Sequence, residues 1–197
     1  MTDFWIYVEI GLKHVLSSNG YDHILFLMAL VIPNTFKEWK KILLFVTVFT
    51  IGHTLALFLS VFNVIMIKAS LVEFLIPITI LITAVFNFFS VRKSIKNNKT
   101  TAIVFITLFF GVIHGLGFSN YFKTILPGNA SDKLAPLLEF ALGIEGAQMT
   151  LIIAILIVSY SLQSFFKISK RDFIIVSSAL IVGVVVPMIL QNDIWNR

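Results

Sequence analysis

The chain has 197 residues, of which 58% are hydrophobic and 13% are charged, and its mean hydropathy is +0.96. Soluble domains contain roughly 45–50% apolar and about 25% charged residues, so this composition excludes a soluble fold and places the chain in a bilayer. The net charge of +5 does not indicate nucleic-acid binding, because the basic residues stand in short runs between apolar stretches. The chain has no cysteine, so a metal site must use histidine, carboxylate, amide or backbone ligands.

The N-terminal region has the least regular hydropathy pattern. We expect residues 4–17 to form an amphipathic or half-inserted helix, because polar residues at 17–20 interrupt the apolar pattern. Residues 21–36 are then predicted to form a short first span, which Pro33 and Asn34 end. The alternative is a chain that crosses seven times, but residues 4–17 reach only about 21 Å as a helix, short of the roughly 30 Å hydrocarbon core.

Five further apolar stretches are each long enough to cross the membrane, which takes about 17 or more residues. They cover residues 42–61, 71–90, 102–118, 137–162 and 172–190. Together with the short first span they predict an all-α fold, a single integral membrane bundle over residues 1–197 with six spans and an additional N-terminal helix.

Basic residues are unequally divided between the two sides of this six-span arrangement. The loops 37–41, 91–101 and 163–171 carry ten of the 15 Lys and Arg residues. Because positively charged loops stay in the cytoplasm, we expect these loops inside and both termini outside. The expected location is an inner (cytoplasmic) membrane.

Polar side chains within the predicted spans gather in the outer half of the membrane. By the helical rise, His53 and His114 lie about 17–18 Å from the cytoplasmic start of their spans, just past the midplane. Ionisable residues at such depth are costly and are therefore functional candidates. The competing interpretation is that each one is a hydrogen-bonding strut between helices. The cytoplasmic half of the spans is almost purely apolar, so the sequence indicates no polar path to the cytoplasm.

We predict that several of these side chains converge on one divalent transition metal. The candidate ligands are His23, His53, His114, Asp22, Glu145 and His14. Imidazole combined with carboxylate suits Zn, Ni, Co, Fe or Mn, and we expect Ni²⁺, Zn²⁺ or Co²⁺. Glu73, Gln148 and Glu139 are expected to orient the imidazoles, as metal-bound histidines usually require. Asp22 is an alternative candidate for that orienting role, because it cannot point in the same direction as its neighbour His23 on a regular helix.

At these positions the sequence resembles the HupE/UreJ family of bacterial membrane proteins. The matching motifs are those at residues 11–14, 20–26, 49–54, 72–73, 110–118 and 143–148. The resemblance covers most of the chain, although the spacing between His14 and Asp22 is longer than in the family's first motif. The family is associated with hydrogenase and urease gene clusters, which implies permeation of nickel or cobalt.

Three functions remain open at this stage. The leading hypothesis is a transition-metal permease, with nickel as the expected cargo and with passive or ion-coupled transport, because no nucleotide-binding glycine-rich loop is present. The second is an intramembrane zinc hydrolase in which a spare carboxylate acts as general base. The third is an accessory or structural membrane subunit without a metal. The expected partners are membrane lipid and a metal ion, not nucleic acid. Whether the chain forms a homo-oligomer is an open question at this point.

Overall fold

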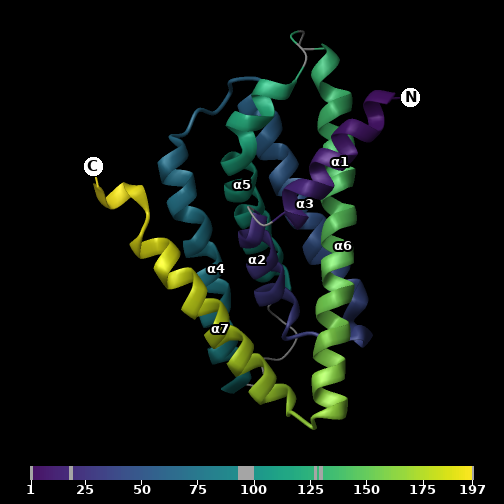
Figure 1. Ribbon diagram of the computed structural model, residues 1–197, viewed down its shortest axis with the longest axis vertical. Helices are drawn as coiled ribbons and strands as arrows, with labels where there is room; N and C mark the ends of the chain where they lie inside the picture. Colours follow the sequence, from purple (N-terminus) through teal and green to yellow (C-terminus); the bar gives the residue numbers. More distant parts are fainter. Residues whose placement is uncertain (1, 18–19, 93–99, 127, 129–130, 197) are drawn as a thin grey trace.

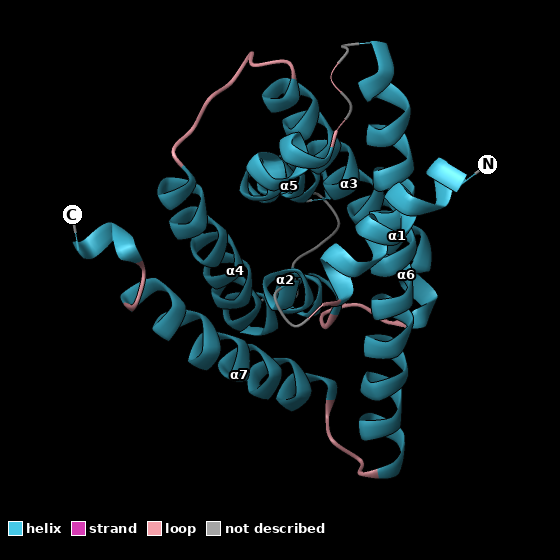
Figure 2. Ribbon diagram, turned by 45° about the horizontal axis from the view of Figure 1, so that its top comes forward, coloured by secondary structure: helices cyan, strands magenta, loops and turns pink. Residues whose placement is uncertain are grey.

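The protein is an all-α bundle in the computed structural model, which describes residues 2–17, 20–92, 100–126, 128 and 131–196. No strand occurs within these ranges, so the predicted fold class is confirmed (Figures 1 and 2). The long helices are α1 (Thr2–Leu16), α2 (Tyr21–Val31), α3 (Trp39–Val61), α4 (Ala69–Arg92), α5 (Thr100–Ile125), α6 (Leu134–Phe165) and α7 (Lys170–Leu190). Short 3₁₀ helices are η2 (Phe36–Glu38), η3 (Ser131–Lys133) and η4 (Asp193–Asn196).

Helices α3 to α7 are long and apolar enough to cross a membrane, by length and composition. Each contains one of the five predicted long spans and extends past it at one end or both. The difference is largest for α5, which continues beyond residue 118 through several polar positions. Ser119 and Thr124 fit within this helical segment because their hydroxyls are satisfied by donating to carbonyls three residues earlier, at 2.7 Å in each case.

The predicted first span, 21–36, is shorter in the structure. Helix α2 ends at Val31, and the N–H of Asn34 donates to the Val31 carbonyl at 2.8 Å, closing a turn around Pro33. Its 11 residues reach only about 17 Å, less than the roughly 30 Å core. Helices α1 and α2 follow one another from the upper end of the bundle toward the lower end (Figure 1). Six crossings therefore result only if these two helices make the first crossing together.

Helix α1 has one buried face and one exposed face, as expected of a half-inserted helix. On the exposed face, Glu9 and Lys13 form an ion pair at 2.6 Å. On the buried face, Gly11 packs against α6, where a Cβ atom in its place would collide with the carbonyl oxygen of Phe140. Gly143 of α6 is equally close to the α1 backbone. Glycines on both helices thus allow the two backbones to touch.

Helices α3 and α5 make the most extensive contact in the bundle. Three glycines permit it, because a Cβ atom at Gly52, Gly111 or Gly115 would collide with a backbone carbonyl of the other helix. For Gly115 that carbonyl belongs to His53, and His114 is the preceding residue. The close approach of these two helices therefore determines how far apart the two intramembrane histidines lie.

The loops separate to the two ends of the bundle as a six-span arrangement requires. At the lower end, Lys170 at the start of α7 lies 4.0 Å from Glu38 before α3. At the upper end, Lys123 of α5 donates to Asn63, which follows α3, at 3.3 Å. The basic loops before α3 and before α7 thus lie at the same end, whereas the basic loop 91–101 falls mostly outside the described residues.

Candidate metal centre

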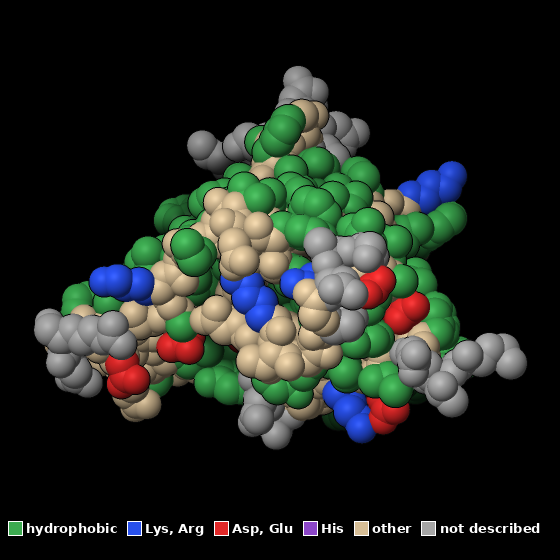
Figure 3. All heavy atoms as spheres, turned by 90° about the horizontal axis from the view of Figure 1, so that it is seen from above, with side chains coloured by type: hydrophobic (Ala, Val, Ile, Leu, Met, Phe, Trp, Pro, Cys, Tyr) green, Lys and Arg blue, Asp and Glu red, His purple; other side chains and the backbone are tan. Residues whose placement is uncertain are grey.

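All four histidines lie close together in the interior, although they belong to four different helices. His14 is near the end of α1, His23 near the start of α2, and His53 and His114 are near the middle of α3 and α5. His23, His53 and His114 are at most 2% exposed, and His14 is half-buried. Seen from above in Figure 3, no histidine side chain is visible on the upper face. We call these four residues the histidine cluster.

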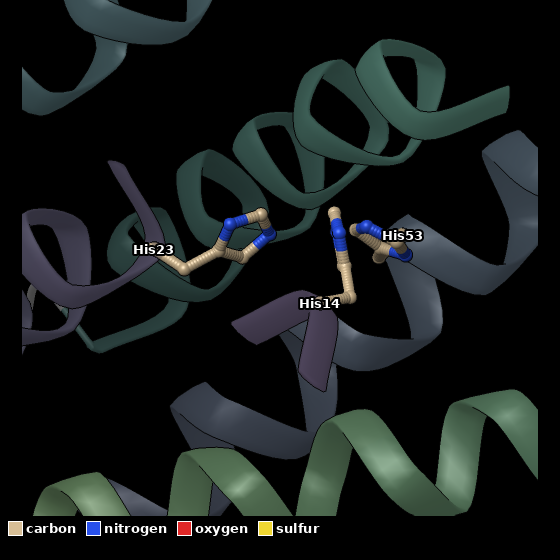
Figure 4. A group of neighbouring side chains, drawn as sticks. All are labelled: His14, His23 and His53. Carbon is tan, nitrogen blue, oxygen red and sulfur yellow. The ribbon is translucent and has the colours of Figure 1, made fainter. Parts of the chain in front are cut away.

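Three of the imidazoles form the tightest part of the cluster (Figure 4). One ring nitrogen each from His14, His23 and His53 can be chosen so that all three lie within 4.8 Å of one another. The ring centroids are 4.7 Å apart for His14 and His23, and 5.6 and 5.9 Å from each of these to His53. A tetrahedral metal with bonds of about 2.0–2.1 Å would draw such nitrogens to about 3.3 Å from one another. Small side-chain movements therefore suffice for coordination.

His114 stands beside this group as the fourth imidazole. Its ring centroid is 5.3 Å from that of His23. Its Nδ1–H donates to the carbonyl oxygen of Phe110 at 2.8 Å, which leaves Nε2 as the free ring nitrogen. Metal-binding histidines are commonly held by such a bond from their second nitrogen.

Five ring nitrogens of the cluster lack hydrogen-bond partners in the part of the chain that the structure describes. The Nε2 atoms of His14, His23 and His114 and both nitrogens of His53 are buried and unpaired. Unpaired polar atoms are expensive in an apolar interior, and bonds to a metal ion would satisfy them. The donor set thus fits an imidazole-binding metal. Aromatic rings with centroids 3.9–6.3 Å from the histidines surround it, namely Phe26, Phe49, Phe118 and Phe140.

Asp22 contacts the cluster through His23. The Nδ1 atom of His23 lies 3.1 Å from Oδ1 of Asp22, and the carboxylate accepts this bond. A carboxylate in that position holds the ring and makes its other nitrogen a better ligand. The structure therefore gives Asp22 the contact of an orienting residue, which was the alternative prediction for it.

The ends of α1 and α2 lie close together around Gly20. The N–H of Gly20 donates to the carbonyl of Ser17 at 2.9 Å, and a Cβ atom on Gly20 would collide with the carbonyl oxygen of His14. Only glycine fits this approach, which places the His14 ring edge-on to that of His23. Gly20 is thus a site residue that the sequence analysis missed, and its position between the two histidines was the available signal.

The two predicted site residues of α6 have threonine partners on α3. Thr47 donates to Oε1 of Glu145 at 2.6 Å, and Thr50 donates to Oε1 of Gln148 at 2.9 Å. Gln148 is fully buried and Glu145 is half-buried. The sequence analysis did not single out these threonines, although they stand three residues apart on one face of a predicted span.

Glu73 and Glu139 lie apart from the histidines. Exposed Glu73 lines a cavity of about 620 Å³ between α4 and α7, to which Tyr21 also contributes. Glu139 is half-buried in the upper part of α6. Within the described residues, neither carboxylate has a hydrogen bond or ion pair with a histidine. Their predicted orienting role has no contact to support it here.

The fold and the cluster define a polytopic helical membrane protein with a buried group of histidines that could hold a metal ion. A family model described as HupE / UreJ protein matches residues 1–192, nearly the whole chain. The protein therefore belongs to the HupE/UreJ family, which is linked to the handling of nickel and cobalt. A search of curated proteins finds no match, and neither does a search of solved structures.

Proposed function

We propose that this protein is a transition-metal permease that carries Ni²⁺ across the membrane through the histidine cluster. The observation that carries the proposal is the set of ring nitrogens on His14, His23 and His53, which come from three helices to within 4.8 Å of one another. Imidazole is a good ligand for nickel and also for cobalt and zinc. Membership of a family linked to nickel and cobalt favours the first two metals over zinc.

The separation of α1 from α2 also supports a transport function. Many secondary transporters bind their substrate where a membrane helix is discontinuous, close to the middle of the bilayer. Here α1 ends at Leu16 and α2 begins at Tyr21, and His14 and His23 flank the junction. In Figure 1 the end of α1 and the start of α2 lie near half the height of the bundle.

The proposed orientation places the lower end of the bundle in the cytoplasm and both termini outside a bacterial inner membrane. The basic loops before α3 and α7, which meet at the lower end, support it. In this orientation the metal reaches the cluster from the outside and leaves toward the lysine-rich loops.

A metal-dependent hydrolase is the competing function, and one contact weighs against it. Such an enzyme needs a carboxylate free to act as general base toward a metal-bound water. Asp22 is the carboxylate that contacts the cluster, and it is engaged by His23. A permease needs no such base.

Elemental analysis and uptake together test the proposal. Protein purified without chelator should contain about one equivalent of nickel when nickel is supplied, and proteoliposomes should accumulate it. His53→Ala and His114→Ala should each abolish both nickel binding and nickel uptake. Gln163→Ala is the matched control, because Gln163 is a polar residue of α6 that bonds only within its own helix, to Ser159. Protein that holds no metal, or His53→Ala protein that accumulates nickel like the wild type, would contradict the proposal.

A further inference from the structure

Two polar pairs cross the interface between α3 and α6. Thr47 bonds to Glu145 at 2.6 Å and Thr50 to Gln148 at 2.9 Å. On each helix the two residues are three positions apart, so they share a face. The interface therefore has a group of four oxygen-bearing side chains in a region that is otherwise apolar.

The hydrogen-bonding capacity of this group is incompletely used. Gln148 is 0% exposed, and its Nε2 atom has no partner within the described residues. The Thr50 hydroxyl has a single proton but two acceptors in reach, Gln148 at 2.9 Å and the Val46 carbonyl at 3.2 Å. If Thr50 donates to Val46, the amide can turn so that Nε2 donates to the threonine and Oε1 becomes free to bind a cation.

Glu145 is the second incompletely satisfied member of the group. Its carboxylate forms no ion pair with any lysine, arginine or histidine that the structure describes. A half-buried carboxylate without a counter-ion is costly at membrane depth, so a bound cation would stabilise it. The hydroxyl of Thr47 and the nearby amide of Gln148 are the additional oxygen ligands that a cation would need.

The group lies between the histidine cluster and the lower end of the bundle. Helix α3 begins at the lower end with Trp39, and Thr47 and Thr50 precede His53 by six and three residues. At the helical rise these offsets are about 9 and 5 Å along the helix. The side chain of Gln148 leans toward the start of α6, which is its upper end, and so toward the histidines.

We propose that Thr47, Thr50, Glu145 and Gln148 form a second, oxygen-lined cation site that receives the metal ion from the histidine cluster. This inference rests on the proposed permease function. Oxygen ligands hold late transition metals less tightly than imidazole does, and conduction requires sites that an ion can leave. The second site thus extends the polar path toward the cytoplasmic end, along a stretch where the sequence alone indicates none.

A binding experiment tests the site independently of transport. Mn²⁺ serves as the probe, because carboxylate and amide oxygens suit it, and bound Mn²⁺ is counted by the loss of the free-ion electron paramagnetic resonance signal. With the histidine site removed by His53→Ala, the protein should still bind one Mn²⁺, and adding Glu145→Gln should abolish this binding. Thr150→Val is the control, since Thr150 is exposed on α6 and bonds to its own helix. The absence of Mn²⁺ binding in His53→Ala protein, or its persistence in the double variant, would overturn the site.

Uptake into proteoliposomes tests the order of the two sites. Glu145→Gln and Thr47→Val should retain one nickel at the histidine cluster but transport it at least about tenfold more slowly, the effect of losing one charge-assisted hydrogen bond. Uptake at the wild-type rate in both variants would overturn the inference while leaving the permease proposal intact. Loss of nickel binding by His53→Ala is the separate test on which the permease proposal depends.

Discussion

The helix pairs α3–α5 and α4–α7 have similar apolar compositions but pack differently. Between α3 and α5, glycines bring the backbones into contact, and this pair carries His53 and His114. Between α4 and α7 a cavity of about 620 Å³ remains, α4 has no glycine, and the one glycine of α7, Gly183, is exposed rather than packed against α4. The comparison teaches that hydropathy alone does not indicate where a bundle is tight. The helix pair whose backbones touch is the one that positions the two candidate ligands His53 and His114.

The largest expected effect comes from adding a side chain to the tight pair. Gly52→Leu would drive a Cβ atom into the Leu108 carbonyl, so it should destabilise the protein by at least about 1–3 kcal/mol, the usual cost of overpacking, and abolish nickel binding. The control change on α7, Gly183→Leu, adds the same side chain at an exposed position with nothing within 4 Å of its Cβ atom, so it should leave both properties unchanged. The two variants are compared by their melting temperatures in detergent and by the amount of nickel that each binds. Equal melting temperatures for Gly52→Leu and Gly183→Leu would contradict the expected difference between the two helix pairs.

The next largest effect is expected from acidification, which should weaken nickel binding by the histidine cluster. Protons compete with the metal for imidazole, which binds metal only when neutral. Once the pH falls below the pKa values of these imidazoles, three histidine ligands should together lose up to about a thousandfold in nickel affinity for each pH unit. The protein should therefore retain nickel less strongly as the pH falls. Because the proposed site opens outward, lowering the external pH at constant internal pH should suffice, and uptake that ignores external pH would contradict it.

Removal of the orienting carboxylate should have an intermediate effect. Asp22→Asn keeps the size of the side chain but weakens its bond to His23, so nickel affinity should fall by about 10–100-fold, the typical cost of losing a ligand's supporting partner. Titration with nickel, followed by the rise in melting temperature that a bound metal produces, measures the change. Complete loss of binding would instead identify Asp22 as a direct ligand.

The smallest effect is expected in the loose pair. Glu73→Gln alters an exposed residue of the cavity between α4 and α7, and it should leave nickel stoichiometry and affinity unchanged. Binding measured side by side with Asp22→Asn provides the comparison. A loss as large as that of Asp22→Asn would return Glu73 to the orienting role predicted from the sequence.

Much of the site could be predicted from the sequence because intramembrane polar residues are few. Four histidines in an apolar chain without cysteine favour a metal site; in the structure, nitrogens of His14, His23 and His53 lie within 4.8 Å of one another, and the His114 ring centroid lies 5.3 Å from that of His23. The partners of Glu145 and Gln148 could not be predicted in this way, because a threonine is common in membrane helices and its contacts depend on which helix packs beside it.

By itself the sequence determined the membrane class and the five long helices, because about 20 apolar residues in a row have one stable arrangement in lipid, the hydrogen-bonded helix. The sequence also determined which side chains are available as metal ligands, namely imidazoles and carboxylates but no thiols. Only the tertiary structure decided that the predicted first span ends at Val31, too short to cross alone, and that the close approach at Gly20 brings His14 beside His23. Distances between side chains on different helices depend on how closely the backbones approach, and that approach follows from glycines on both partners at once rather than from any one segment.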